Sequence, residues 1–173
     1  MAKNKPVYAF EEADSKKRML LGGKGAGLSE MTRLKLPVPP GFTITTEVCN
    51  KYYDNNGKLP KDVMPAVMKN IAKMEKKTGK KWNSTKNPLL VSVRSGAAIS
   101  MPGMMDTILN LGLNDKTVQA LSIKTSNPRF AKDSYRRFIQ MYSSVVLGIE
   151  SYIFEELIEN YKLTKGVIKD TEL

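Results

Sequence analysis

The spacing of apolar residues changes along this chain, and the change divides it into two parts. Short apolar or β-branched runs, which predict strands, cover residues 7–10, 41–46, 89–93 and 108–113. Apolar residues at intervals of three and four, which predict helices, cover residues 28–36, 46–53, 60–78, 114–124, 129–146 and 152–163. The pattern predicts an α/β (α+β) fold, with a lobe at 1–113 built on a mixed sheet and a helical subdomain at 114–173.

Local signals predict where several helices begin and end. Thr46 and Asn114 are suited to cap helix amino termini, and Gly79 is suited to end the helix over 60–78. The apolar side of the first predicted helix consists of Leu28, Met31, Leu34 and Leu36. We therefore expect this side to face the core.

Composition places the chain among globular proteins. Of its 173 residues, 41% are hydrophobic and 26% are charged, which is typical of a folded domain. No segment approaches the ~20 consecutive apolar residues of a membrane span, and the amino terminus lacks the apolar region of a secretory signal. The only cysteine, Cys49, excludes an intrachain disulfide and is expected to be a packed thiol. These features favour a cytoplasmic protein with no membrane partner.

The positive charge is concentrated in the first part of the chain. Residues 1–111 hold 19 Lys and Arg against 9 Asp and Glu, whereas the remainder holds 9 against 8. Much of the excess lies along one predicted helix and its exit, at Lys61, Lys69, Lys73, Lys76, Lys77, Lys80 and Lys81. Such a row is usually a solvated face, although it also attracts nucleotides or acidic partners. Nucleic acid is not the expected partner, because no known nucleic-acid-binding motif accompanies the charge.

The most informative segment is PLLVSVRSGAAISMPGMMDTILNLGLND, residues 88–115. Here an apolar strand, expected to be buried, ends at Arg94 and is followed by small residues that leave the backbone uncrowded. A guanidinium at such a strand end offers paired donors to a phosphate, and Gly103 allows a backbone N–H to approach a ligand. The alternative is a structural ion pair between Arg94 and a carboxylate such as Asp106.

A second basic residue lies in the glycine-rich segment GGKGAG, residues 22–27. We expect a turn there, followed by a helix, so that Lys24 can reach a phosphate while nearby N–H groups point the same way. The segment is neither a Walker A loop nor a dinucleotide fingerprint, because its lysine precedes the last glycine and no acidic partner follows at the required distance. Taken alone, the segment is better explained as a tight turn with an exposed lysine. Together, Lys24 and Arg94 suggest two sides of one polyphosphate pocket.

Three stretches in this order resemble the amino-terminal part of the pyruvate, phosphate dikinases, and the resemblance covers nearly the whole chain. They are LLGGKGAGLSEMTRLKLPVPPGFTITTEVC, LLVSVRSGAAISMPGMMDTILNLGLND and NPRFAKDSYRRFIQMYSSVV. Phosphoenolpyruvate synthases share the GGK turn and the VRS strand end, but they do not continue as GAAISMPGMMDTILNLGLND. A phosphoenolpyruvate synthase-like ATP-binding domain is therefore the alternative within this group.

The resemblance implies a partial ATP-grasp lobe that binds ATP. Lys24 and Arg94 match the phosphate-binding lysine and arginine of the family, and Gly103 matches a glycine whose N–H lies near the terminal phosphates. In the family, the magnesium ligands, a swivelling domain with a phosphorylated histidine and a pyruvate-binding barrel lie further along a longer chain. We therefore expect neither catalytic residues nor metal ligands here, and we expect the chain to be a piece of a longer protein or a truncated gene product.

Absence of histidine limits what the chain can do alone. No residue can become the phosphohistidine that the family's reaction requires, so we expect the isolated chain to be inactive in the complete reaction. A hypothesis of another class is a non-catalytic module that binds an acidic partner through its basic face. Binding through that face should weaken with salt and should not depend on Lys24 or Arg94.

Overall fold

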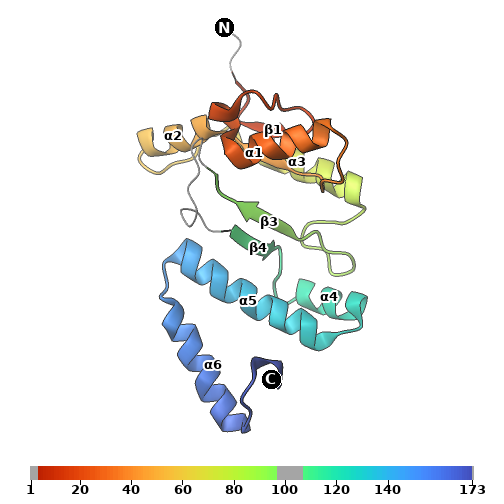
Figure 1. Ribbon diagram of the computed structural model, residues 1–173, viewed down its shortest axis with the longest axis vertical. Helices are drawn as coiled ribbons and strands as arrows, with labels where there is room; N and C mark the ends of the chain where they lie inside the picture. Colours follow the sequence, from red (N-terminus) through yellow and green to blue (C-terminus); the bar gives the residue numbers. More distant parts are fainter. Residues whose placement is uncertain (1–3, 97–106, 173) are drawn as a thin grey trace. The chain divides into compact units, whose positions relative to one another are not determined.

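The computed structural model describes residues 4–96 and 107–172, and it divides into two compact units (Figure 1). The first unit comprises Met1–Leu89 and Arg94–Asp106, and the second comprises Leu90–Val93 and Thr107–Leu173. Among the described helices, none has the length and apolar character needed to span a membrane. The domain boundary expected near residue 113 stays a prediction.

In the first unit, a two-stranded sheet is surrounded by three helices. Its elements are β1 (Val7–Ala9), α1 (Arg18–Arg33), β2 (Phe42–Ile44), α2 (Thr46–Asp54) and α3 (Val63–Thr78). Strands β1 and β2 pair antiparallel, with Tyr8 opposite Thr43. Among the buried apolar side chains are Val7, Leu21, Val48 and Val63. The strands are short, so the helices supply most of this core.

Ion pairs join α3 to the segment between β1 and α1. Lys73 pairs with Glu12, and Lys77 pairs with Glu11. The hydrogen bond from each lysine is the main cause that lowers the pKa of its carboxyl below the usual value. Part of the lysine-rich face is therefore used within the chain itself.

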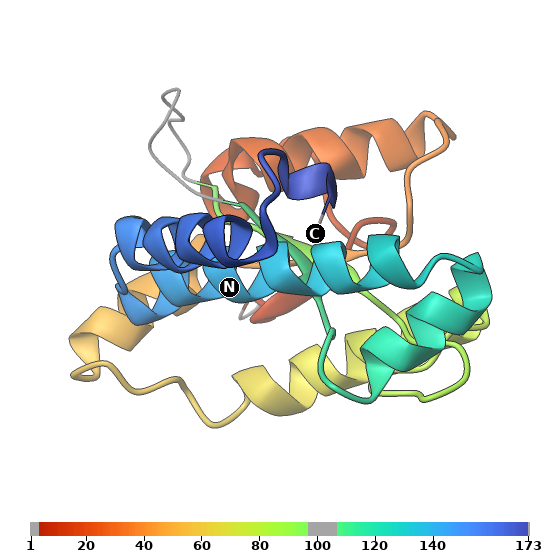
Figure 2. The same ribbon diagram turned by 90° about the horizontal axis from the view of Figure 1, so that it is seen from below.

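In the second unit, one long helix packs on a two-stranded sheet, and two other helices pack against that helix. Strand β3 (Val91–Arg94), whose last residue is assigned to the first unit, pairs with β4 (Thr107–Leu111). Helices α4 (Thr117–Thr125), α5 (Pro128–Leu147) and α6 (Ser151–Lys165) follow, and a short 3-10 helix covers Asp170–Glu172. Helix α4 packs against α5, and the two lie side by side in Figures 1 and 2. The core consists of Leu113, Val118 and Ala131, with Leu90, Leu121, Tyr135 and Phe138 packed against it.

Several predictions from the pattern are confirmed. The described part has four strands and six α-helices, which lie close to the expected ranges except for α1, which begins well before residue 28. Gly79 ends α3 with a left-handed φ of 68°. Asn114 caps α4, because its side-chain oxygen accepts hydrogen bonds from the N–H groups of Lys116 and Thr117, each at 3.0 Å. The prediction of a single mixed sheet was wrong, because the described strands form two separate two-stranded sheets.

Four local predictions were wrong. On the expected apolar side of α1, Leu34 is 56% exposed and Met31 is 37% exposed, and the helix instead buries residues such as Leu21 and Ala26. Thr46 does not cap α2; its hydroxyl donates to the carbonyl of Met19 at 2.7 Å. The thiol of Cys49 is exposed.

The fourth concerns the strand before Arg94. Leu89 is buried, but Val93 is 45% exposed. A continuous apolar run cannot by itself distinguish a strand buried on both faces from one covered only at its start. Arg94, the candidate for binding phosphate, therefore ends a strand that is partly exposed.

Candidate functional site

Lys24 lies within α1, near a sharp break in that helix. Gly22 has φ 70° and ψ 164°, a conformation outside the helical range, so that α1 consists of two helical segments. The prediction of a loop over residues 22–27 was therefore wrong, because Gly23 to Gly27 are helical. A residue with this backbone geometry interrupts the regular hydrogen-bond ladder of a helix. Lys24 thus occupies the start of the second segment.

The ammonium group of Lys24 reaches the end of β3. Its Nζ donates a hydrogen bond to the backbone carbonyl of Ser95 at 2.9 Å. A Cβ placed on Gly96 would lie 3.6 Å from Cβ of Lys24 and 3.8 Å from its Cγ and Cδ. Residues 71 positions apart in the sequence are therefore in direct contact.

This contact brings Lys24 to the residue that follows Arg94. Arg94 ends β3 with an exposed side chain, and both residues belong to the first unit. An ammonium and a guanidinium that lie close together can offer donors to the same polyanion. The two segments are thus in contact through Ser95. The shared phosphate pocket and the roles of the two side chains stay predictions.

The third candidate, Gly103, lies outside the described residues, as does Asp106. The predicted N–H contact and the alternative ion pair with Arg94 thus stay predictions. In the described part of the chain, no three Cys, Asp or Glu side chains gather closely enough to hold a metal ion. The magnesium prediction stays untested as well.

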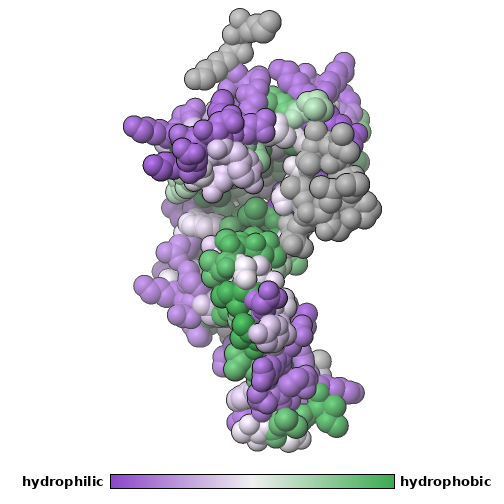
Figure 3. All heavy atoms as spheres, turned by 90° about the vertical axis from the view of Figure 1, so that its left-hand side faces the viewer, coloured by the Kyte–Doolittle hydropathy of each residue, from purple (hydrophilic) through white to green (hydrophobic). Residues whose placement is uncertain are grey.

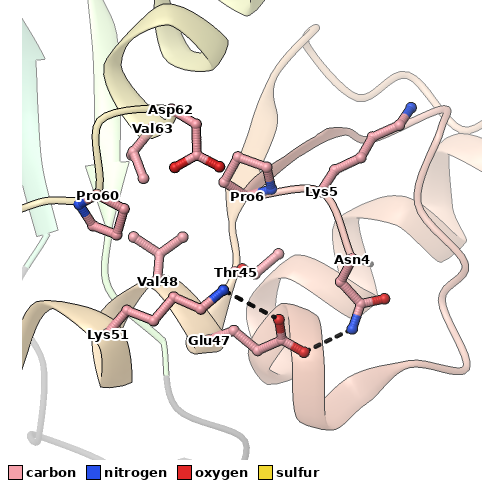
Figure 4. A pocket seen from close by; sticks show the side chains of 10 residues that line it. All are labelled: Asn4, Lys5, Pro6, Thr45, Glu47, Val48, Lys51, Pro60, Asp62 and Val63. Carbon is pink, nitrogen blue, oxygen red and sulfur yellow. Dashed lines mark hydrogen bonds and ion pairs between the residues drawn. The ribbon is translucent and has the colours of Figure 1, made fainter. Parts of the chain in front are cut away.

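A small cavity in the first unit lies at other residues (Figure 4). Its volume is about 10 Å³, which accommodates about one water molecule. Asn4 and Lys51 both approach the Glu47 carboxylate there, at 2.7 Å and 4.0 Å (Figure 4). The cavity is too small for a nucleotide.

A larger groove, of about 270 Å³, lies between α5 and α6 in the second unit. Ile139, Phe154, Leu157 and Ile158 make its lining mostly apolar. Hydrophobic surface also gathers over the helical part of this unit in Figure 3. An apolar groove does not suit a triphosphate. The neighbourhood of Lys24 and Ser95, next to Arg94, therefore remains the best candidate for an anionic ligand.

Two basic side chains of helix α5 share a carboxylate partner. Arg136 and Arg137 both bind Asp133, at 2.7 Å and 2.8 Å. Burial raises the pKa of the Asp133 carboxyl, but the two arginines outweigh it and the pKa is lowered overall. These arginines therefore have a structural role in α5.

Sequence reasoning missed the residues that fix the position of Lys24. The Ser95 carbonyl accepts its hydrogen bond, and Thr43 of β2 lies against the helix beside it. No side-chain pattern reveals a backbone acceptor. The one usable signal was Gly25, since a glycine within a helix indicates that another segment approaches closely.

Comparison with known sequences identifies the family. Residues 18–63 and 55–146 match the family described as "Pyruvate phosphate dikinase, AMP/ATP-binding domain". This chain belongs to that family. The matched residues include Lys24 and Arg94, so that both candidates lie within the AMP/ATP-binding domain of pyruvate phosphate dikinases as the family is defined.

Similarity to individual pyruvate phosphate dikinases extends over almost the whole chain. The enzyme of Entamoeba histolytica is 57% identical over 167 residues, and that of Clostridium symbiosum is 54% identical over the same length. Each alignment covers 96% of this chain but 19% of the relative. The enzyme of Rickettsia prowazekii is 50% identical, over 98% of this chain and 20% of its own length. The chain therefore spans about one fifth of the length of these pyruvate phosphate dikinases.

Proposed function

We propose that this chain binds the phosphates of ATP through Lys24 and Arg94, as part of the amino-terminal lobe of an ATP-grasp domain. The observation that carries the proposal is the 2.9 Å hydrogen bond from Lys24 Nζ to the Ser95 carbonyl, next to Arg94. The match of residues 18–146 to an AMP/ATP-binding domain supports it. Gly103 is proposed as a further N–H donor to the terminal phosphates.

The chemistry follows from charge. During phosphoryl transfer, negative charge shifts among the phosphate oxygens, and donors fixed beforehand stabilise it without reorganising. An ammonium supplies a point charge, whereas a guanidinium offers two parallel N–H donors that match two phosphate oxygens. Lys24 and Arg94 therefore have complementary roles in holding one polyphosphate.

The activity that we propose for the longer protein is that of pyruvate, phosphate dikinase. There, ATP, phosphate and pyruvate give AMP, diphosphate and phosphoenolpyruvate through a phosphohistidine carrier. The present chain has no histidine and cannot supply that carrier. Its proposed partners are ATP, the swivelling phosphohistidine domain and the pyruvate-binding barrel. Magnesium and a cytoplasmic location are part of the same proposal.

Nucleotide binding by this chain should be weak, because a grasp site holds its ligand from two sides and only one is proposed here. We therefore choose an assay that detects dissociation constants in the millimolar range, namely amide NMR shifts up to ~10 mM MgATP. Residues 23, 24, 95 and 96 should shift in the wild type. The shifts should disappear in Lys24→Ala and Arg94→Ala.

Lys69→Ala is the matched control, because it removes one exposed lysine from the basic helix α3. Site binding predicts that this variant keeps the nucleotide response. If Lys69→Ala weakened binding while Lys24→Ala and Arg94→Ala kept it, and if salt abolished it, the basic-face hypothesis would be favoured instead. A wild-type spectrum that MgATP does not change would refute nucleotide binding by this chain.

A further inference from the structure

Helix α1 makes an unusually close approach to β2 at Gly25, the residue next to Lys24. A Cβ placed on Gly25 would lie 2.8 Å from both Cγ2 and Oγ1 of Thr43 and 3.4 Å from its Cβ. Carbon atoms in contact prefer separations of about 3.5–4.0 Å. Only glycine fits at this point of the helix without movement of one segment.

Thr43 cannot relieve the contact by rotating. It is β-branched, so its Cβ carries two heavy atoms, and each staggered rotamer leaves at least one of them facing Gly25. Its backbone is also fixed, since Thr43 lies opposite Tyr8 in the β1–β2 pair. A side chain at position 25 would therefore displace α1 rather than Thr43.

Lys24 would move with the helix. Its side chain is held at its tip, because Nζ donates to the Ser95 carbonyl, and its stem lies near Gly96. Restoring an ordinary contact at position 25 requires a displacement of roughly 1 Å, from 2.8 Å to the preferred separation. A shift of this size in a group that positions a substrate can reduce activity by up to about 10²-fold.

We propose that Gly25 is a positioning residue, which sets the place of the Lys24 ammonium group by letting α1 seat directly on Thr43. The role towards nucleotide rests on the proposed function above. The role towards Lys24 itself does not, because the contact with Ser95 is present without any ligand.

The test compares Gly25→Ala with Gly27→Ala. Both add one methyl group to the same helix, but a Cβ on Gly27 has no atom within 4 Å. Two double variants complete the set. Gly25→Ala with Thr43→Ser keeps one heavy branch, which can rotate away, whereas Gly25→Ala with Thr43→Val keeps both branches and the clash.

The first measurement needs no nucleotide. The ¹⁵N ammonium signal of Lys24, assigned by its loss in Lys24→Arg, should shift in Gly25→Ala and remain in place in Gly27→Ala. In the double variants, the Lys24 signal should return to its wild-type position with Thr43→Ser but not with Thr43→Val. An unchanged Lys24 signal in folded Gly25→Ala, or equal recovery by both Thr43 substitutions, would overturn the proposal.

The second measurement is the NMR response to a fixed concentration of MgATP. Gly25→Ala should lower it at least about tenfold, and Thr43→Ser should restore it, with Gly27→Ala unaffected. Failure of the wild type to respond would refute the proposed nucleotide site and leave the ammonium measurement to decide the role of Gly25. A moved Lys24 signal with an unchanged MgATP response would show that Gly25 does not act on nucleotide through Lys24.

Discussion

The same methyl group added at Gly25 and at Gly27 should change the stability of the first unit by different amounts. Replacing glycine by alanine inside a helix gains about 1 kcal/mol through backbone propensity, and this gain is common to both positions. At Gly25 alone, the methyl group lies 2.8 Å from two atoms of Thr43. Such overpacking costs about 1–3 kcal/mol. Gly27→Ala should therefore stabilise by about 1 kcal/mol, and Gly25→Ala should lie about 1–3 kcal/mol below it.

Urea unfolding followed by tryptophan fluorescence measures this difference directly. The chain has one tryptophan, Trp82, and it belongs to the same unit as Gly25. With an m-value of about 2 kcal/mol per molar, a gap of about 2 kcal/mol separates the two midpoints by about 1 M. Equal midpoints for Gly25→Ala and Gly27→Ala would refute the close approach of α1 to β2.

Two further predictions concern the ion pairs of α3 and the exposed thiol. The pKa values of Glu11 and Glu12 are lowered by hydrogen bonds from Lys77 and Lys73, so their stabilisation should be complete above the unfolded value near 4.5 and lost as the pH falls through the lower folded values. A double Glu→Gln variant should flatten this acid limb in urea titrations, and high salt should weaken the limb in the wild type, because these pairs are partly exposed. Cys49 should react with a thiol reagent in the folded protein as fast as in urea, and protection of more than about tenfold would contradict its exposed position.

Most helices and strands could be predicted because their signals are local. The apolar spacing of α5 and α6 and the glycine at the end of α3 depend only on neighbouring residues. The two-part strand pairing could not be predicted, because pairing depends on contacts far apart in the sequence. The exposed Cys49 was missed for the same reason, since burial is decided by what packs against a helix face.

The site was predictable in its residue types and not in its geometry. Lys24 and Arg94 were identified because basic side chains beside small residues suit phosphate. The position of Lys24 inside a broken helix was missed, because glycines have low helix propensity and the segment resembled a turn. What overrides propensity is the contact of Gly25 with Thr43, which a larger residue would prevent.

The break at Gly22 gives a last prediction, because its backbone can be adopted by glycine almost alone. With φ 70° and ψ 164°, Gly22 lies outside the left-handed helical region that asparagine tolerates. Gly79, with φ 68° and ψ 9°, lies within it, and a Cβ there meets nothing within 4 Å. Gly22→Asn should therefore cost about 1–3 kcal/mol and move Lys24, whereas Gly79→Asn should cost a few tenths. Urea unfolding by circular dichroism, with the Lys24 ammonium signal as the local probe, distinguishes the two. Equal costs with Lys24 unmoved would mean that the break in α1 does not determine where the lysine lies.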